Sequence, residues 1–424
     1  MSAPFVELGL REVWGGQQPL RLYAPERRRH VFITGQTGVG KSTLIQNIVA
    51  QDIANGHGVA LLDPHGDLSS AVLDFIPGNR VDDVIIIDPT DLDRPVGFNP
   101  FYRVPPDERA LVAANITATF KHQWRDSWGP RLEYILFNVC RALLDAPDNL
   151  RPSFIAIPLV LVNADYRQRL VRHIGDPRVR SFFSDEFETW NERYVIEAIG
   201  PVQNKIGQFL ANPMTRNILG QWKPSMEIGE VLEDNRILIL RLPKGLIGDE
   251  AANLFGSFIV SAIQQAAMRR AARTEAERSD FHLVIDEFAN FTNETFASIL
   301  SESRKYGLTL TIGSQYLDQA SQSINQAIFG NVGSIIAFRV SADDADRLAR
   351  EIGSYPPPRY RELERGDVLA RIAQAGTTSI SCIGKTFSEP TEKFAHAKNI
   401  WHQSRIRYGN DRHKVENRIA RWLA

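Results

Sequence analysis

Short, continuous runs of apolar residues recur in two parts of the chain, one before residue 100 and one after residue 235. Runs of this length, rich in Val and Ile and bounded by polar turns, are typical of strands buried in a parallel sheet. Segments with apolar residues at helical spacing separate the runs, and this alternation predicts an α/β fold. The predicted core strands cover residues 30–34, 58–62, 83–89, 236–242, 281–287, 307–315 and 333–340.

A different pattern fills residues 105–225, where helical spacing dominates and strand candidates are few. We predict an all-α domain there, inserted between two segments of the core, 29–104 and 226–354. Its aromatic residues are more typical of helix packing than of base stacking. The predicted helices are 108–120, 130–144, 165–174, 179–193 and 196–210 in the insertion, and 43–54, 69–75, 249–273, 293–305 and 343–352 in the core, with one more beginning near Asp318.

Both ends of the chain predict smaller β elements. Residues 1–28 are expected to form a short β extension, and residues 355–424 a hairpin around Gly376 followed by a basic helix from about residue 399. Residues 398–424 hold seven Lys and Arg against two acidic residues, a net charge of +5. A solvated helix face is the more ordinary interpretation of this excess, and a nucleic-acid surface is the alternative.

The composition indicates the cellular setting of the chain but does not indicate its function. The chain has 424 residues, a hydrophobic fraction of 43% and a formal net charge of -1, so that any DNA-binding surface has to be local. Cys140 and Cys382 lie far apart and form no metal or redox pattern, which suggests a reducing, cytoplasmic setting. No apolar stretch reaches the length of a membrane span, and no signal peptide is predicted.

The segment after the first core strand carries the most specific motif. Gly35 to Ser42 fit the phosphate-binding pattern G-x-x-x-x-G-K-[ST], with a strand before them and a helix after them. Lys41 can reach the β- and γ-phosphates of a nucleotide, and the Ser42 hydroxyl can hold Mg²⁺. An ordinary Gly-rich turn is the alternative, and the flanking elements argue against it. The predicted nucleotide-binding residues are Gly35, Gln36, Thr37, Gly38, Val39, Gly40, Lys41, Ser42 and Thr43.

Two later strands end in polar side chains that suit the same chemistry. Asp286 and Glu287 end an apolar strand, where an Asp can order the Mg²⁺ shell and a Glu can orient or deprotonate the attacking water. Gln315 ends the next strand and can sense the γ-phosphate. The alternatives are an exposed acidic turn for the pair and a helix cap for Gln315.

These motifs together resemble the FtsK–HerA superfamily of hexameric DNA-pumping ATPases, and more narrowly the type IV secretion coupling proteins of the VirD4, TraD and TraG families. The segments that carry the resemblance are 35–43, 63–68, 284–288 and 303–308, the last leading to Ser314-Gln315. The resemblance implies a RecA-like core, ATP and Mg²⁺ as cofactors, and a homo-oligomer, expected to be a hexamer. It also implies that Lys41, Glu287 and Gln315 are catalytic and that Ser42 and Asp286 hold the metal.

The resemblance further implies an arginine finger, which reaches the nucleotide of a neighbouring subunit. Arg304 matches that position, and the alternative for it is an ordinary surface residue of a helix. Arg339, on the last core strand, is a competing candidate for the finger. The family's N-terminal transmembrane helices and β-barrel have no counterpart in residues 1–28, so a soluble stand-alone member is expected. Lys244 is a candidate pore residue, although a surface Lys is the more ordinary interpretation.

The favoured hypothesis is a DNA translocase that hydrolyses ATP at subunit interfaces and contacts DNA mainly through phosphates. One alternative is an ATP-gated scaffold that assembles with a partner effector, and another is an ATPase acting on polypeptide. A relaxase-type protein is a further possible partner. A P-loop kinase fits poorly, because no lid-like Arg cluster follows and an Asp-Glu pair suits water activation better.

Overall fold

The computed structural model describes residues 4–292, 296–374, 379–390 and 392–423. The chain divides into two compact units. Unit 1 consists of residues 1–86, 228–243 and 263–404, and unit 2 of residues 87–227, 244–262 and 405–424. Unit 2 therefore contains the predicted insertion, 105–225, together with residues on both sides of it and the end of the chain.

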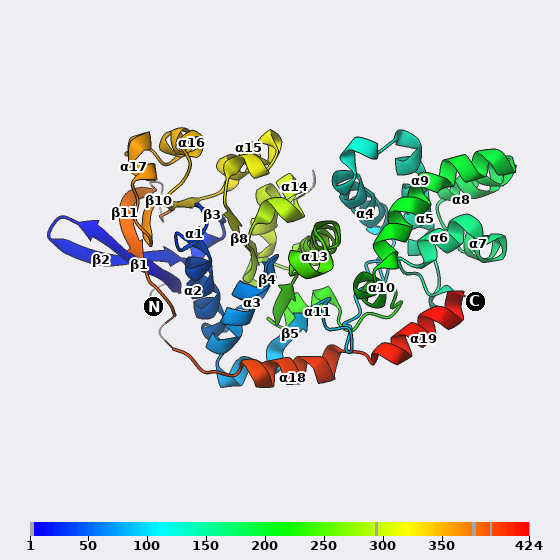
Figure 1. The fold of residues 1–424 in the computed structure, drawn as a ribbon, viewed down its shortest axis with the longest axis horizontal. Helices are drawn as coiled ribbons and strands as arrows, with labels where there is room; N and C mark the ends of the chain where they lie inside the picture. The colour runs from blue at the N-terminus through cyan, green and yellow to red at the C-terminus, as the bar shows by residue number, and fades with distance from the viewer. Residues whose placement is uncertain (1–3, 293–295, 375–378, 391, 424) are drawn as a thin grey trace. The chain divides into compact units, whose positions relative to one another are not determined.

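Unit 1 is built on one eleven-stranded sheet with the order β2-β1-β11-β10-β9-β3-β8-β7-β4-β6-β5 (Figure 1). Every predicted core strand is present, and the prediction of a mainly parallel P-loop sheet is confirmed. The strands are β1 Phe5–Val13, β2 Gly16–Tyr23, β3 Val31–Thr34, β4 Gly58–Asp63, β5 Val84–Ile87, β6 Ile237–Arg241, β7 Phe281–Ile285, β8 Leu308–Ser314, β9 Ser334–Ala337, β10 Asp367–Ile372 and β11 Ile380–Thr386.

The central strands are parallel. β3 pairs with β8 and β9, β7 pairs with β8 and β4, and β4 also pairs with β6. β9 pairs with β10, β10 with β11, β11 with β1 and β1 with β2, all antiparallel. The two terminal β elements therefore extend the core sheet instead of forming separate layers. The predicted hairpin turn at Gly376 lies outside the described residues.

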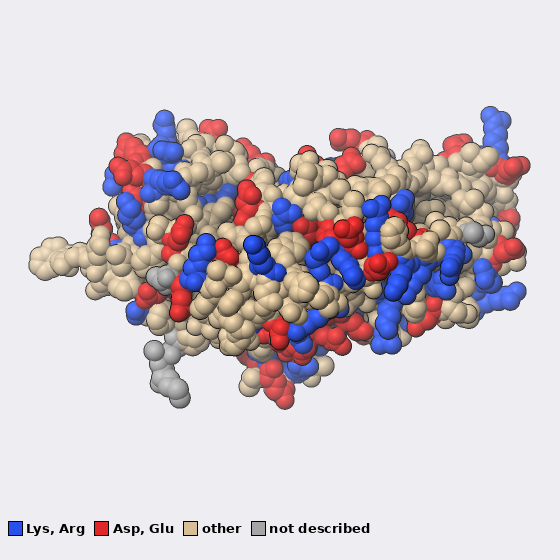
Figure 2. Space-filling view, turned by 60° about the horizontal axis from the view of Figure 1, so that its bottom comes forward, with Lys and Arg blue, Asp and Glu red and all other residues tan. Residues whose placement is uncertain are grey.

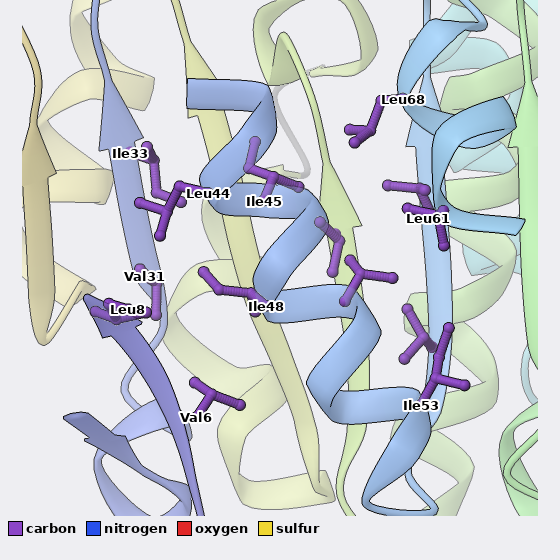
Figure 3. Close-up of a cluster of buried hydrophobic side chains, with 14 of the residues drawn as sticks. Val6, Leu8, Val31, Ile33, Leu44, Ile45, Ile48, Ile53, Leu61 and Leu68 are labelled. Carbon is purple, nitrogen blue, oxygen red and sulfur yellow. The ribbon is translucent and has the colours of Figure 1, made fainter. Parts of the chain in front are cut away.

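Alternating side chains of β3 build a core on both faces of the sheet. Val31 and Ile33 point to α2 (Lys41–Ala54), where Leu44, Ile45 and Ile48 recur at helical spacing and are fully buried (Figure 3). Each such side chain stabilises the fold by roughly 1.5–3 kcal/mol. Phe32 points to the opposite face, with its ring centre 6.1 Å from that of Phe288 and 5.9 Å from that of Phe329.

The remaining helices of unit 1 are short. They are α1 Ala24–Arg27, α3 Asp67–Val72, α11 Ile228–Glu233, α14 Phe296–Glu302, α15 Gln322–Asn331, α16 Ala342–Ile352 and α17 Pro357–Arg361. The helix predicted near Asp318 is displaced, because Leu317–Gln319 form a 3₁₀ turn and the Ser321 side chain caps α15. The predicted start of α14 at Asn293 lies outside the described residues.

Unit 2 is all-α, as the sequence predicts. Its helices are α4 Arg109–Gln123, α5 Pro130–Leu144, α6 Ala156–Val162, α7 Ala164–Val171, α8 Pro177–Ser181, α9 Glu192–Ala211, α10 Pro213–Leu219, α12 Lys244–Ile247 and α19 Arg412–Leu423. α13 (Asp249–Arg269) and α18 (Ala397–Tyr408) belong partly to each unit. The rings of Phe120, Phe154, Phe209 and Phe258 contact one another at 4.9 to 6.4 Å between centres, so these aromatic residues pack the unit.

The prediction of one helix over 179–193 is wrong. α8 ends at Ser181, residues 182–186 form a π turn, and α9 begins only after Asn191, whose side chain accepts a hydrogen bond from the Tyr194 amide at 2.9 Å. Phe182, Phe183 and Phe187 are all buried around this widened turn.

No helix in the described part of the chain combines the length and the apolar character that crossing a lipid bilayer requires.

Candidate functional site

The loop between β3 and α2 has the geometry of a phosphate-binding loop. Gly38 and Gly40 have φ angles of 81° and 117°, which favour glycine. A Cβ atom on Gly35 would lie 2.6 Å from Cβ of Phe338, so a side chain does not fit there. The first turn of α2 has no side-chain cap among the described residues, and its amide groups remain available to an anion at the helix N-terminus.

A cavity of 370 Å³ opens beside this loop at the carboxyl edge of the sheet. Its lining brings together the predicted residues of three strands that are far apart in the sequence. The lining residues are Gln36, Thr37, Gly38, Gly40, Lys41, Ser42, Thr43, Asp63, His65, Asp67, Leu68, Asp286, Glu287, Gln315 and Arg365.

Lys41 is the buried cation of this cavity. Its side chain is largely buried, and burial lowers the pKa of the amine, while the charges of Asp286 and Glu287 act in the opposite direction. A largely buried ammonium group beside the loop amides is suited to binding a phosphate oxygen, because water screens its charge only weakly.

Ser42 and Asp286 meet at the predicted metal position. The Ser42 hydroxyl donates a hydrogen bond to Oδ2 of Asp286 at 3.2 Å. Burial raises the pKa of the Asp286 carboxyl, and Lys41 opposes that effect. A Cβ atom on Gly313 would lie 2.9 Å from Oδ1 of Asp286, so the neighbouring strand leaves room for this carboxylate. A hydroxyl and a carboxylate oxygen form a hard donor set that fits Mg²⁺, whose other ligands are commonly phosphates and water.

The carboxylate of Glu287 is contacted by two polar side chains from neighbouring strands. Nε2 of Gln315 donates a hydrogen bond to Oε1 of Glu287, and Nε2 of His65 lies 3.0 Å from the same oxygen. Thr37 in the loop donates to Oε1 of Gln315 at 3.3 Å. Since β8 lies between β3 and β7, Gln315 connects the phosphate-binding loop to the carboxylate.

The segment 63–68 contributes more to the site than its sequence alone assigns to it. Asp63 ends β4, is buried, and accepts hydrogen bonds from the amides of His65 at 2.9 Å and Ser69 at 2.7 Å. This turn places His65 against Glu287. Sequence reasoning identifies the segment only as a carrier of the resemblance, although its signal, a strand ending in Asp beside a His-Gly turn, is present in the sequence.

Arg365 is a second residue that sequence reasoning missed. It is exposed, precedes β10 and lines the cavity. The amide of the next residue, Gly366, donates to the carbonyl of Val39 at 2.9 Å, which fixes the turn against the phosphate-binding loop. No sequence motif marks this Arg, because only the pairing of β10 with β9 brings it to the site.

Arg304 lies outside the cavity of its own chain. It belongs to the 3₁₀ turn Ser303–Tyr306 before β8, at the amino edge of the sheet, whereas Gln315 follows β8 at the other edge. A strand of this length separates the two edges by roughly 20 Å. Arg339, the competing candidate, is exposed, and its carbonyl accepts a hydrogen bond from the Gln36 amide at 2.9 Å. Lys244, the candidate pore residue, begins α12 in unit 2 and is half-buried.

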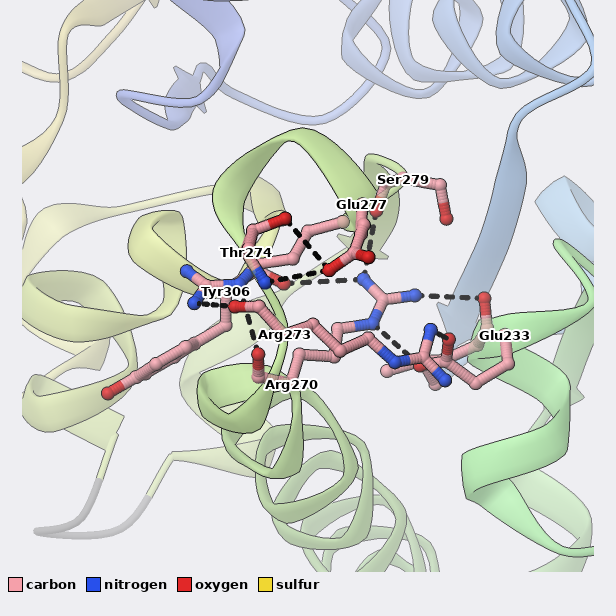
Figure 4. Close-up of polar contacts among 9 residues, drawn as sticks. Glu233, Arg270, Arg273, Thr274, Glu277, Ser279 and Tyr306 are labelled. Carbon is pink, nitrogen blue, oxygen red and sulfur yellow. Dashed lines mark hydrogen bonds and ion pairs between the residues drawn. The ribbon is translucent and has the colours of Figure 1, made fainter.

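The turn that carries Arg304 is held by two other arginines (Figure 4). The guanidinium group of Arg270 is buried and donates to the carbonyls of Ser279 at 2.9 Å and Tyr306 at 3.3 Å, and to Glu233 at 2.8 Å. Arg278 donates to the carbonyl of Lys305. The exposed side chain of Arg304 therefore projects from a turn whose backbone is fixed by hydrogen bonds.

Two family profiles match the chain. Residues 12–110 match the family described as "Helicase HerA, central domain", and residues 280–369 match the family described as "TraM recognition site of TraD and TraG". No functionally curated protein matches the chain significantly. The two profiles confirm the resemblance to HerA and to coupling proteins that the motifs predicted.

Solved structures confirm the fold. The unbound form of the bacterial conjugative coupling protein TrwBΔN70 aligns with a TM-score of 0.67 and 16% identity over 93% of this chain and 97% of that chain. The plasmid coupling protein TrwB in complex with ADP and Mg²⁺ aligns with a TM-score of 0.63 and 16% identity, again over 93% of this chain and 97% of that chain. VirB4 of Thermoanaerobacter pseudethanolicus aligns with a TM-score of 0.58 and 14% identity, over 92% of this chain and 98% of that chain.

Proposed function

We propose that this chain is an oligomeric motor that hydrolyses ATP and moves DNA, in the manner of the coupling proteins it resembles. One observation carries the proposal: Gln315 lies between Thr37 of the phosphate-binding loop and the Glu287 carboxylate, in hydrogen-bond contact with both. This arrangement suits hydrolysis, because it can detect a terminal phosphate and position the base that activates water.

ATP and Mg²⁺ are the proposed cofactors. TrwB has been described in complexes with ADP and Mg²⁺ and with a non-hydrolysable ATP analogue. In this chain the loop amides and Lys41 would bind the phosphates, and Ser42 and Asp286 would hold the metal. The metal would supply positive charge that neutralises the phosphate oxygens.

Glu287 is the proposed general base. Its side chain is largely buried, and its backbone has a φ of 50°, a left-handed conformation that is uncommon for a residue other than glycine. Such strain is retained where the surroundings over-determine the conformation, as His65, Gln315 and Asn290 do here. The conformation turns the carboxylate toward the cavity that holds Lys41.

Subunits of a homo-oligomer, which we propose to be a hexamer, would share the site. Arg304 projects from a fixed turn at the edge of the sheet that faces away from its own cavity. A head-to-tail ring would place this edge of one subunit near the carboxyl edge of the next. Arg304 would then stabilise charge on the transferred phosphoryl group in the neighbouring site.

DNA and a protein are the proposed partners. Contacts to DNA would be mainly to phosphates, and binding would therefore weaken as salt increases. The match of residues 280–369 to a family described by TraM recognition favours an additional relaxosome-type protein partner.

Steady-state ATP hydrolysis tests the proposal. The rate would be measured without DNA, with single-stranded DNA and with duplex DNA, at low and moderate salt, for the unchanged chain and for Glu287→Gln. We expect DNA to stimulate hydrolysis, and stimulation to fade as salt rises. We expect Glu287→Gln to lower kcat by roughly a hundredfold to ten-thousandfold, since it removes a general base.

If Glu287→Gln abolishes hydrolysis but no DNA changes its rate, the chain is an ATPase and the proposal that it moves DNA is refuted. ATP-dependent oligomers with slow hydrolysis would then favour the scaffold, and stimulation by a polypeptide would favour an ATPase acting on protein.

A further inference from the structure

Two neighbouring cavities in unit 2 are separate from the nucleotide site. One has a volume of 340 Å³ and the other 390 Å³. Both lie against α19, and Arg151 and Trp422 line both of them. The first also contacts Trp222, Lys223 and Arg418, whereas the second also contacts Tyr166, Arg169 and Arg421. Because Arg151 and Trp422 line both, the two cavities adjoin each other, and together we call them the recess.

The recess is basic and holds no acidic side chain among the described residues. Its walls carry five Arg and Lys residues and no Asp or Glu. Within the described part of the chain, Arg151, Lys223, Arg418 and Arg421 form no ion pair. Figure 2 shows Lys and Arg gathered on this face of the molecule, over the part of the chain that includes α19. Unpaired guanidinium groups around one recess are suited to binding several phosphates of a polyanion.

Aromatic rings lie among these charges. The Trp222 ring packs against Tyr102 with 6.4 Å between ring centres, and the Trp422 ring meets Tyr166 edge to face at 6.1 Å. The Tyr166 hydroxyl donates to the carbonyl of Leu150 at 2.8 Å, which fixes this second pair. Both Trp side chains are only half-buried. Partly exposed rings with a fixed orientation are suited to stacking against unpaired bases.

The spacing of residues along α19 brings both charged and aromatic side chains to the recess. Val415 and Ile419 are four residues apart and buried, and they pack the helix against unit 2. Arg418 and Trp422 are likewise four residues apart and share the adjoining stripe, while Arg421 follows one turn after Arg418. The basic excess at the end of the sequence is therefore directed in part toward a hollow, and not only toward open solvent.

We propose that this recess binds single-stranded DNA, with phosphates on the arginines and bases stacked on Trp222 and Trp422. The inference rests on the proposed function in taking DNA as the substrate, and it assigns a binding site on unit 2 away from the site of hydrolysis. A duplex conceals its base faces within the stack, so that rings in a recess cannot reach them. An acidic peptide would use the charges but leave the Trp faces without a matching group.

Fluorescence anisotropy of a labelled short thymidine oligonucleotide with the full chain, in the absence of nucleotide, tests the site. Arg418→Gln/Arg421→Gln removes two exposed charges of the recess. We expect about tenfold weaker binding, and a salt slope that falls by about 0.7 for each phosphate that the variant no longer neutralises. Trp222→Leu should weaken binding by roughly fivefold to a hundredfold, as removal of one stacking ring does.

Lys414→Gln/Arg193→Gln is the matched control, because it removes two exposed charges of unit 2 that do not line the recess. If this control weakens the oligonucleotide as much as the recess variant does, binding is diffuse and the site is refuted. Tighter binding of duplex DNA or of a poly-glutamate peptide than of the oligonucleotide would also overturn it. If Trp222→Leu does not fold, the binding measured for Arg418→Gln/Arg421→Gln tests the site by itself, because both of these side chains are exposed.

Basal ATP hydrolysis without DNA, measured on the same variants, keeps the two proposals distinguishable. We expect it to be unchanged, because none of these residues lies in the nucleotide cavity. If DNA stimulates hydrolysis by Arg418→Gln/Arg421→Gln as strongly as hydrolysis by the unchanged chain, the proposed function stands and the proposal that the recess binds DNA is refuted.

Discussion

At the scale of single residues, the nucleotide cavity combines groups that a motif identifies with groups that only the fold identifies. Lys41, Ser42 and Asp286 follow from short patterns with a known chemistry. Arg365 and His65 do not, because an exposed Arg and a His after a turn occur in most proteins. Their positions depend on which strands become neighbours, and that depends on the packing of the whole sheet.

Arg365→Ala should raise the KM for ATP by about tenfold, since a hydrogen bond to a charged group contributes about 1.5–3 kcal/mol and this one is exposed. The stability of the protein should not change. Hydrolysis as a function of ATP concentration measures the effect. Arg361→Ala, an exposed Arg of α17 outside the cavity, is the control. Equal KM values in the two variants would exclude Arg365 from nucleotide binding.

His30 makes the stability of the protein depend on pH. The amide of Leu310 donates to Nδ1 of His30 at 3.1 Å, and Nε2 lies 3.1 Å from the carbonyl of Leu300. These partners suit the neutral ring with its proton on Nε2. Burial, with a smaller contribution from the charge of Arg304, lowers the pKa of His30 to about 4 from 6.5.

Because the folded-state pKa is the lower one, the unfolded chain binds the extra proton. The contribution of His30 to stability is full above pH 6.5 and is lost as pH falls from 6.5 to about 4. The loss is about 3 kcal/mol. Urea unfolding across this range measures it. His30→Asn, which tolerates the φ of 64°, should show a smaller pH dependence, and an equal dependence would show that other groups cause the loss.

At the scale of elements, strongly patterned segments were predictable and interrupted ones were not. Pro130–Leu144 agrees with α5 at both ends, because a Pro begins it and apolar residues recur at helical spacing throughout. The segment 179–193 also has helical spacing, but burial of three Phe side chains overrides local propensity there. Tertiary packing of this kind leaves no signal in a single sequence.

Arg270 links α11, the loop before β7 and the 3₁₀ turn that ends at Tyr306, and its loss should weaken all of them. Arg270→Met should lower the free energy of unfolding by roughly 3 kcal/mol, because it leaves the carbonyls of Leu232, Ser279 and Tyr306 without their donor. Arg273, which pairs with the same Glu233 at a more exposed position, provides the control.

Denaturant unfolding measures both variants. We expect Arg273→Met to change stability by less than about 1 kcal/mol, as exposed ion pairs do. Equal losses for Arg270 and Arg273 would show that the charge of Glu233, and not the bonds to the backbone, holds the network together.

At the scale of the whole molecule, the position of Arg304 predicts a site shared between subunits. Arg304→Ala and Glu287→Gln should each nearly abolish ATP hydrolysis. When equal amounts are mixed, about a quarter of the interfaces in a head-to-tail ring combine an intact Glu287 with an intact Arg304 from the neighbour. Activity should therefore reappear on mixing, and should increase with protein concentration.

Failure of the mixture to recover activity, with both variants folded and assembled, would contradict the shared site. Full activity of Arg304→Ala alone would direct attention to Arg339, which lies beside the phosphate-binding loop of its own chain.

The order of the strands has a consequence for how the protein is made. β3 ends at Thr34, yet both of its neighbours leave the ribosome much later, because β8 begins at Leu308 and β9 at Ser334. Until they emerge, both edges of β3 lack partners and resemble the open edges through which unfinished sheets aggregate. A nascent chain therefore carries its complete phosphate-binding loop long before it can hold a nucleotide, and chaperones would have most to protect during that interval.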